Sequence, residues 1–175
     1  SALIYFKDMN EACHAVTKLK LARDSKEIIV DAVELMDRAA LRSIENDPVM
    51  PEFIKDFDEN VTALLIETRA LSDEKLNIQI EQIEDLLKEF EVKRKIYFTK
   101  DEQEYNLYWK IRKGLFPAVG AVRVTGTTVI IEDVAYPIEH LAEATLELQD
   151  LFKKHGYSEA LIFGHALEGN FHFVF

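Results

Sequence analysis

The stretch that we expect to organise the fold is Leu161-Ile-Phe-Gly-His-Ala-Leu-Glu-Gly-Asn-Phe-His-Phe-Val-Phe175. Two apolar runs, residues 161–163 and 171–175, flank a short segment that contains Gly164, Gly169 and Asn170. Apolar, β-favouring runs joined by residues that tolerate positive φ angles are typical of a β-hairpin. The sequence therefore predicts two antiparallel strands in this stretch.

The predicted hairpin carries two histidines. His165 lies where its first strand ends, and His172 lies early in its second strand. Antiparallel pairing across the loop would bring both imidazoles to one edge of the sheet. Two neutral imidazoles can bind a divalent metal, and a complete site needs at least one more ligand. The alternative is that both histidines are ordinary hairpin residues hydrogen-bonded to the backbone. This alternative stays open because the spacing His-x6-His is not a specific pattern.

Charge and cysteine content exclude several classes of protein. The formal net charge of −11 argues against a nucleic-acid partner, which would need clustered Lys and Arg. The single cysteine, Cys13, excludes an internal disulfide and a cysteine-ligated cluster within this chain. No apolar stretch approaches the roughly 20 residues that span a bilayer, and nothing resembles a signal peptide. We expect a cytoplasmic protein, not membrane-spanning, with peripheral association at the cytoplasmic membrane face left open.

Strand, long helix and strand recur along the chain, which predicts a repeat of topology. Helical periodicity and capping residues predict helices over 10–21, 37–44, 73–90, 101–115 and 137–155. Alternating or continuous apolar runs predict strands over 2–6, 27–35, 62–68, 92–99 and 128–134, besides the hairpin. We expect a loop from Pro117 to Thr128.

These elements favour an α+β fold of ferredoxin-like split βαβ units, with a largely antiparallel sheet and helices packed on one face. A doubly wound parallel sheet is the alternative, and the chain lacks the Gly-rich strand-to-helix turn typical of it. The chain starts directly with an apolar strand and stops inside another. We therefore interpret residues 1–175 as part of a longer protein.

Three motifs occur in order along the second half of the chain. They are Trp109-Lys-Ile-Arg112-Lys-Gly114-Leu-Phe-Pro117-Ala-Val-Gly120, then Ile131-Glu-Asp133-Val-Ala-Tyr-Pro137, then Gly164-His165 to Gly169-Asn170-Phe-His172. Together they resemble the C-terminal substrate-binding (cap) domain of FAD-linked oxidases, the group of D-lactate, glycolate and D-2-hydroxyglutarate dehydrogenases. The likeness is greatest to long bacterial members fused to an iron–sulfur region. It covers 1–175 loosely and 109–175 specifically.

The resemblance implies roles for individual residues. Arg112 matches the arginine that pairs with the substrate carboxylate, and a planar, permanently charged guanidinium suits that role. His165 and His172 match the histidines that ligate a divalent metal (Zn, Mn or Fe) beside the substrate hydroxyl, and we expect them to be the catalytic residues. Asn170 lies between them as a polar substrate contact. The chain departs from many members at Leu167-Glu168, where those members have Gly-Asp.

The resemblance also implies cofactors and a function. FAD would be bound mainly by an N-terminal domain outside this chain, and an iron–sulfur cluster by a further region. The implied activity is oxidation of a D-2-hydroxy acid by hydride transfer to flavin, with residues 1–175 inactive alone. A non-catalytic sensing or interaction module with the same fold is the alternative, since one fold hosts many functions.

Overall fold

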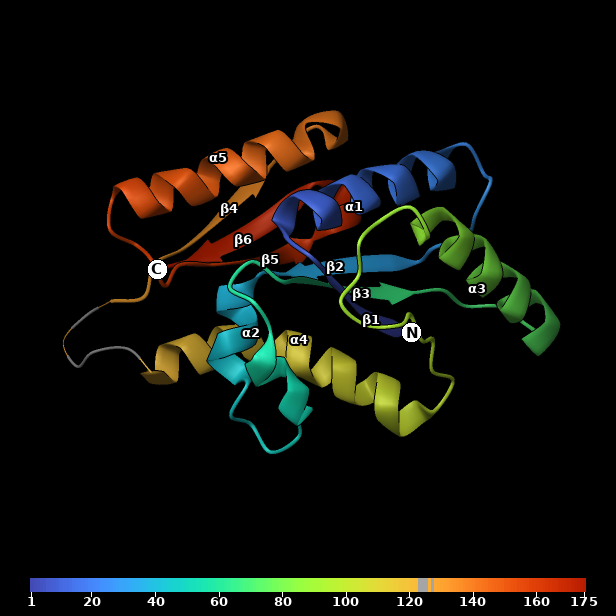
Figure 1. Cartoon of the computed structure of the whole chain (residues 1–175), viewed down its shortest axis with the longest axis horizontal. Coiled ribbons are helices and arrows are strands. Elements are labelled where there is room, and N and C mark those ends of the chain that lie inside the picture. The colour runs from blue at the N-terminus through green and yellow to red at the C-terminus, as the bar shows by residue number, and fades with distance from the viewer. Residues whose placement is uncertain (123–125, 127) are drawn as a thin grey trace.

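The computed structural model describes residues 1–122, 126 and 128–175, and it contains one antiparallel sheet covered by helices (Figure 1). In chain order the elements are β1 (Ala2–Phe6), α1 (Met9–Asp24), β2 (Ala32–Met36), α2 (Arg38–Ile44), η1 (Glu52–Asp56), β3 (Thr62–Glu67), α3 (Asp73–Leu87), α4 (Glu102–Val122), β4 (Ile131–Ala135), η2 (Ile138–His140), α5 (Leu141–Lys154), β5 (Leu161–His165), η3 (Ala166–Glu168) and β6 (Asn170–Val174). The six strands lie in the order β1-β3-β2-β5-β6-β4.

The strand order divides the sheet into two similar halves. In the first half β3 lies between β1 and β2 and is antiparallel to both, so β1 and β2 are parallel and α1 connects them. In the second half β6 lies between β4 and β5 in the same way, with α5 as the connection. Both halves are split βαβ units, as predicted. They join through antiparallel pairing of β2 with β5.

Helices cover both faces of this sheet. One apolar core lies between the sheet and α1, α3 and α5, and it includes Phe6, Leu35, Ile66 and Phe171. A second core lies between the opposite face and α2, α4 and η1 (Figure 1). The α+β fold and antiparallel sheet are confirmed, but the prediction that helices cover one face is wrong. All of β3 is buried, which is what a strand covered on both sides requires.

Several predicted boundaries differ from those observed. The strand predicted over 27–35 is confined to Ala32–Met36, and the strand predicted over 92–99 is reduced to one bridge between Phe6 and Val92. Helix α4 continues through Pro117 to Val122, where a loop was predicted. Proline disfavours a helix interior locally, which is why the sequence predicted an earlier end of this helix. The rest of the predicted loop includes residues 123–125 and 127, which lie outside the described residues.

The predicted apolar face of the helix after Ser72 is partly confirmed. Ile83 and Leu87 are fully buried in the first core. Leu76 and Ile80 are only half-buried. The helix therefore packs on the sheet mainly through its second half.

Candidate functional site

The predicted site residues lie where the two halves of the sheet join. Glu34 of β2 is the direct register partner of His165 of β5, and Phe163 of β5 is the register partner of His172 of β6. Residues opposite each other in an antiparallel pair share a face, and so do residues two apart on a strand. Glu34, Phe163, His165 and His172 consequently share the face that carries α4. The histidines lie within the sheet, since β5 and β6 both have neighbours on each side, and their predicted position at its edge is wrong.

Arg112 reaches this face from α4 and contacts two of these residues. Its Nε donates a hydrogen bond to Glu34 Oε2 at 2.9 Å. Its guanidinium carbon lies 4.9 Å from the ring centroid of Phe163, a cation–π distance. Arg112 is 9% exposed and Glu34 is 5% exposed, so this is a buried ion pair. A buried charge is tolerated when it is paired and hydrogen-bonded, as both are here.

The two histidines lie next to each other, and each has a carboxylate on its Nδ1 atom. Their ring centroids are 5.5 Å apart in an edge-to-face arrangement. His165 Nδ1 lies 2.7 Å from Glu34 Oε1, and His172 Nδ1 contacts Asp133 Oδ1 of β4. The Nε2 atoms are outside these contacts. The structure therefore brings together Arg112, His165 and His172 through one shared carboxylate and one ring contact.

Gly164 permits this approach of the two histidines. A Cβ atom at Gly164 would lie 2.6 Å from the carbonyl oxygen of Asn170 and 2.8 Å from Cα of Phe171. Those atoms belong to β6, so a larger residue at 164 would force β5 away from β6. Glycine is required here because the two backbones touch, and the flanking Phe163 and His165 thereby stay beside His172.

Asn170 is positioned differently from the other predicted residues. It is the register partner of His165, and its side-chain Nδ2 donates a hydrogen bond to the carbonyl oxygen of Val134 at 3.2 Å. This contact fastens the start of β6 to β4. Asn170 therefore has a structural role that accounts for its amide, and its predicted contact with substrate stays a prediction.

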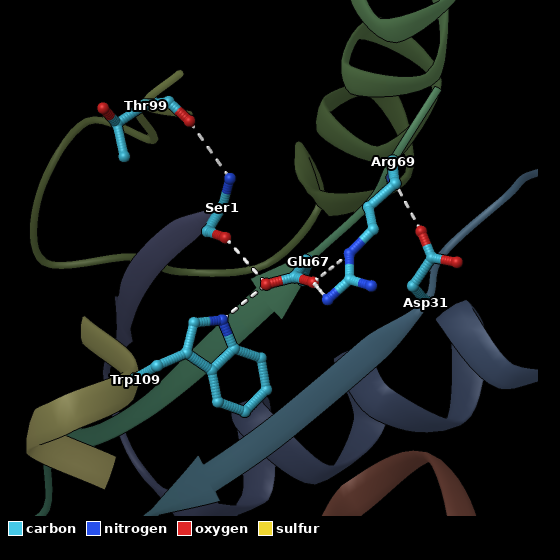
Figure 2. A network of polar contacts seen from close by, with 6 residues as sticks. All are labelled: Ser1, Asp31, Glu67, Arg69, Thr99 and Trp109. Atoms are coloured by element: carbon cyan, nitrogen blue, oxygen red, sulfur yellow. Dashed lines mark hydrogen bonds and ion pairs between the residues drawn. The ribbon is translucent and has the colours of Figure 1, made fainter. Parts of the chain in front are cut away.

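A second buried carboxylate anchors the helix that carries Arg112. Glu67 Oε2 accepts hydrogen bonds from Trp109 Nε1 and from Ser1 Oγ, and Glu67 Oε1 accepts one from Arg69 Nε (Figure 2). Glu67 lies opposite Ala32 in the β2–β3 register, so it shares the α4 face with Glu34. Trp109 and Arg112 are three residues apart on one helix face. Two carboxylates on adjacent strands thus hold successive turns of α4.

Sequence reasoning missed Glu34, Asp133 and Glu67. A signal existed for Glu34, because a lone carboxylate within Ala32-Val-Glu-Leu-Met36 interrupts a short apolar strand. A charge in such a position is costly unless it has a partner. The partners could not be found in the same way, since Arg112 and His165 are 78 and 131 residues away along the chain.

For the metal that the resemblance implies, this site offers two imidazoles, those of His165 and His172. A carboxylate on Nδ1 is the usual arrangement of a metal-binding histidine, and it would leave both Nε2 atoms for an ion. Within residues 1–122, 126 and 128–175, however, no three His, Cys, Asp or Glu side chains form a group able to hold a metal. The described residues do not supply a complete site, and we assign no chemical step to a metal.

Three helix N-termini in the described part of the chain are poorly suited to the diphosphate of FAD. Such a group binds at helix N-termini with free backbone N–H groups. At α1 and α3 an N–H group of the first turn already donates to a capping side chain, that of Asp8 or Ser72. Asp101 caps α4 in the same way, accepting from the N–H groups of Gln103 and Glu104. Acidic caps repel a phosphate, which disfavours the N-termini of α1 and α4 as sites for the diphosphate.

A cavity of about 610 Å³ opens elsewhere, at the other ends of β2 and β5. Its lining combines basic side chains, among them Arg38 and Arg42, with acidic ones, among them Glu59 and Glu159. It contains none of the predicted site residues. The mixed charge favours no particular class of ligand.

Comparison with known proteins identifies the class. The family model for the C-terminal domain of FAD linked oxidases matches residues 1–175, and the chain belongs to this family. Its fold is also similar to that of a solved alkyldihydroxyacetonephosphate synthase, with a TM-score of 0.69 and 14% sequence identity. The match covers 99% of this chain and 35% of that one, so the chain spans about a third of the solved protein. No sequence among curated proteins matches it. Over the described residues, no helix is both long and apolar enough to cross a membrane.

Proposed function

We propose that this chain forms the substrate-binding part of an FAD-dependent oxidoreductase that oxidises a D-2-hydroxy acid, of the D-lactate, glycolate or D-2-hydroxyglutarate class. The observation that carries the proposal is the convergence of Arg112, His165 and His172 on one face of the sheet. These residues come from α4 and from the β5–β6 hairpin, which are separated along the chain by β4 and α5. Oxidation of a hydroxy acid requires a cation for its carboxylate and a base for its hydroxyl group. A permanent cation beside two imidazoles supplies both.

Arg112 serves the carboxylate of the substrate. Its Nε is taken by Glu34, and the Nη1–Nη2 edge of the guanidinium lies outside that contact. An arginine edge binds a carboxylate through two parallel hydrogen bonds, which fixes the orientation of the acid as well as its affinity. Burial strengthens such a pair, because solvent screens it less.

His165 and His172 serve the hydroxyl group. Oxidation of a 2-hydroxy acid to a 2-oxo acid removes the hydroxyl proton and a hydride from the neighbouring carbon, and flavin accepts the hydride in FAD-linked enzymes. An imidazole Nε2 within hydrogen-bond reach of the hydroxyl would take the proton as a general base. Between the two histidines, His165 has the stronger support, since its Nδ1 faces a buried carboxylate whereas Asp133 is exposed.

Replacing the cation tests the proposal. In the flavoenzyme that contains this chain, Arg112→Ala should lower kcat/KM for D-2-hydroxy acids by roughly 30- to 1000-fold, as loss of a charge-assisted pair implies. Arg112→Lys keeps the charge without the planar edge. Its kcat/KM should lie between those of Arg112→Ala and the wild type. Rapid flavin reduction by D-lactate, glycolate and D-2-hydroxyglutarate would be measured anaerobically. Flavin reduction by Arg112→Ala at the wild-type rate would refute the assignment.

A further inference from the structure

Glu34 is a buried carboxylate that serves two residues of the proposed site at once. Its Oε2 accepts from Arg112 Nε at 2.9 Å, and its Oε1 lies 2.7 Å from His165 Nδ1. Its side chain is 7% exposed, whereas that of His165 is 55% exposed. The carboxylate therefore lies beneath the imidazole, on the protein side, and the imidazole faces outward from it.

We propose that Glu34 is a positioning residue that fixes the tautomer of His165 and the orientation of Arg112 together. The proposal deepens the proposed function and rests on it for its catalytic meaning. An ionised carboxylate only accepts hydrogen bonds, so the His165 atom that faces it carries the proton. The neutral imidazole then has its proton on Nδ1 and its lone pair on Nε2, the atom directed away from Glu34.

The shared carboxylate links the two tasks of the site. The carboxylate and hydroxyl groups of a 2-hydroxy acid are on adjacent carbon atoms, so their binding groups must hold a fixed separation. Arg112 is on α4 and His165 is on β5, and Glu34 of β2 contacts both. The ring of Phe163 also contacts the guanidinium, whose central carbon lies 4.9 Å from the ring centroid. Glu34 thereby holds the guanidinium of Arg112 and the Nε2 lone pair of His165 at a fixed separation. Catalysis requires that the groups binding the substrate be positioned precisely.

The isosteric variant Glu34→Gln makes a sharp prediction. A carboxamide has one acceptor atom, and arginine offers only donors. The amide oxygen must then face Arg112 Nε, which leaves the amide NH₂ group facing His165 Nδ1. His165 Nδ1 then has to accept a hydrogen bond from the amide. The imidazole proton therefore moves to Nε2, and the outward lone pair is lost. The variant retains shape and packing and inverts the tautomer.

The tautomer is measured directly by ¹⁵N–¹H correlation spectra of the histidine-labelled 175-residue chain. In the wild type, neutral His165 should show a protonated Nδ1 and an unprotonated Nε2, and Glu34→Gln should show the reverse. Glu67→Gln is the matched control, because Glu67 is a buried glutamate on the same face that also binds a side chain of α4. Its effect should be limited to stability, with the His165 tautomer unchanged.

The outcomes separate this proposal from the proposed function. A protonated Nε2 in wild-type His165 would overturn the positioning role without any variant, as would an unchanged tautomer in folded Glu34→Gln. In the flavoenzyme, Glu34→Gln should lower kcat by roughly 100- to 10 000-fold, the range for general-base catalysis. Inversion of the tautomer with no effect on oxidation of any D-2-hydroxy acid would support the positioning of His165 and refute the proposed reaction instead.

Discussion

Glu34 and His165 are register partners in the strand pair β2–β5, and Glu34 Oε1 lies 2.7 Å from His165 Nδ1. Among the described strands, the pairing of β2 with β5 joins the two halves of the sheet and forms the seam between them. The site therefore depends on how the halves join. Arg112 adds a third element to the same contact, because α4 packs over the seam from one face.

Gly164→Ala should separate the two histidines. Its methyl group would lie 2.6 Å from the Asn170 carbonyl oxygen, so β5 must shift away from β6. We expect a loss of roughly 1–3 kcal/mol in the free energy of unfolding, the usual cost of overpacking. Gly114→Ala is the control, since a Cβ there has nothing within 4 Å. It lies in α4 and should be neutral or stabilising by up to about 1 kcal/mol in urea denaturation. Equal stability of the two variants would contradict the close-approach argument.

Ionisation of Asp37 should lower the free energy of unfolding as the pH rises from about 4 to 7. Burial raises the pKa of Asp37 from its ordinary value of 3.8 to about 7, although backbone hydrogen bonds at Ala40 and Ile162 and the charge of Arg42 act to lower this pKa. In this window the folded state retains a proton that the unfolded state releases. The unfolded state therefore binds fewer protons, and the free energy of unfolding decreases with pH.

Asp37→Asn provides the measurement. Asparagine still caps α2, as Asp37 does through Ala40 N–H, so the variant removes the titration and keeps the cap. Wild type should lose stability relative to Asp37→Asn between pH 5 and pH 7.5 in urea denaturation. Parallel pH profiles for the two proteins would show that Asp37 does not titrate in this range.

Trp109→Phe should loosen the helix that carries Arg112. The substitution removes the N–H group that donates to buried Glu67 and retains an aromatic ring. A hydrogen bond to a charged group contributes about 1.5–3 kcal/mol, and we expect a loss of that order in thermal or urea denaturation. Tyr108→Phe is the matched control on the same helix, because its hydroxyl donates to Glu104 one turn earlier in α4. A similar loss in both variants would argue against Glu67 as an anchor.

Zinc should bind weakly to the two histidines. His165 and His172 offer two ligands, and the described residues contain no group of three. Structural and catalytic zinc sites use three or four protein ligands. Zinc added to the 175-residue chain should therefore be lost on gel filtration, and His172→Ala should weaken binding further in calorimetric titration. Stoichiometric zinc retained after gel filtration would require a third ligand from this chain.

The sequence by itself determined the local elements and the chemical candidates. The hairpin of residues 161–174 follows from two apolar runs around Gly169, and α1 follows from its Asp8 cap and apolar spacing. Arg112, His165 and His172 were found through ordered motifs. Such signals are local, because each depends on side-chain periodicity or on residues that tolerate special backbone angles.

Only the tertiary structure decided how these parts meet. Pairing of β2 with β5 placed Glu34 beside His165, and helices on both faces placed α4 over that pair. Neither the strand pairing nor the placement of the helices can be predicted from a short stretch of sequence. The apolar patterns of β2 and β5 would each allow pairing with several strands. The register is selected by burial of whole faces at once. For the same reason, Arg112 and His165 contact Glu34 although they lie 78 and 131 residues from it along the chain.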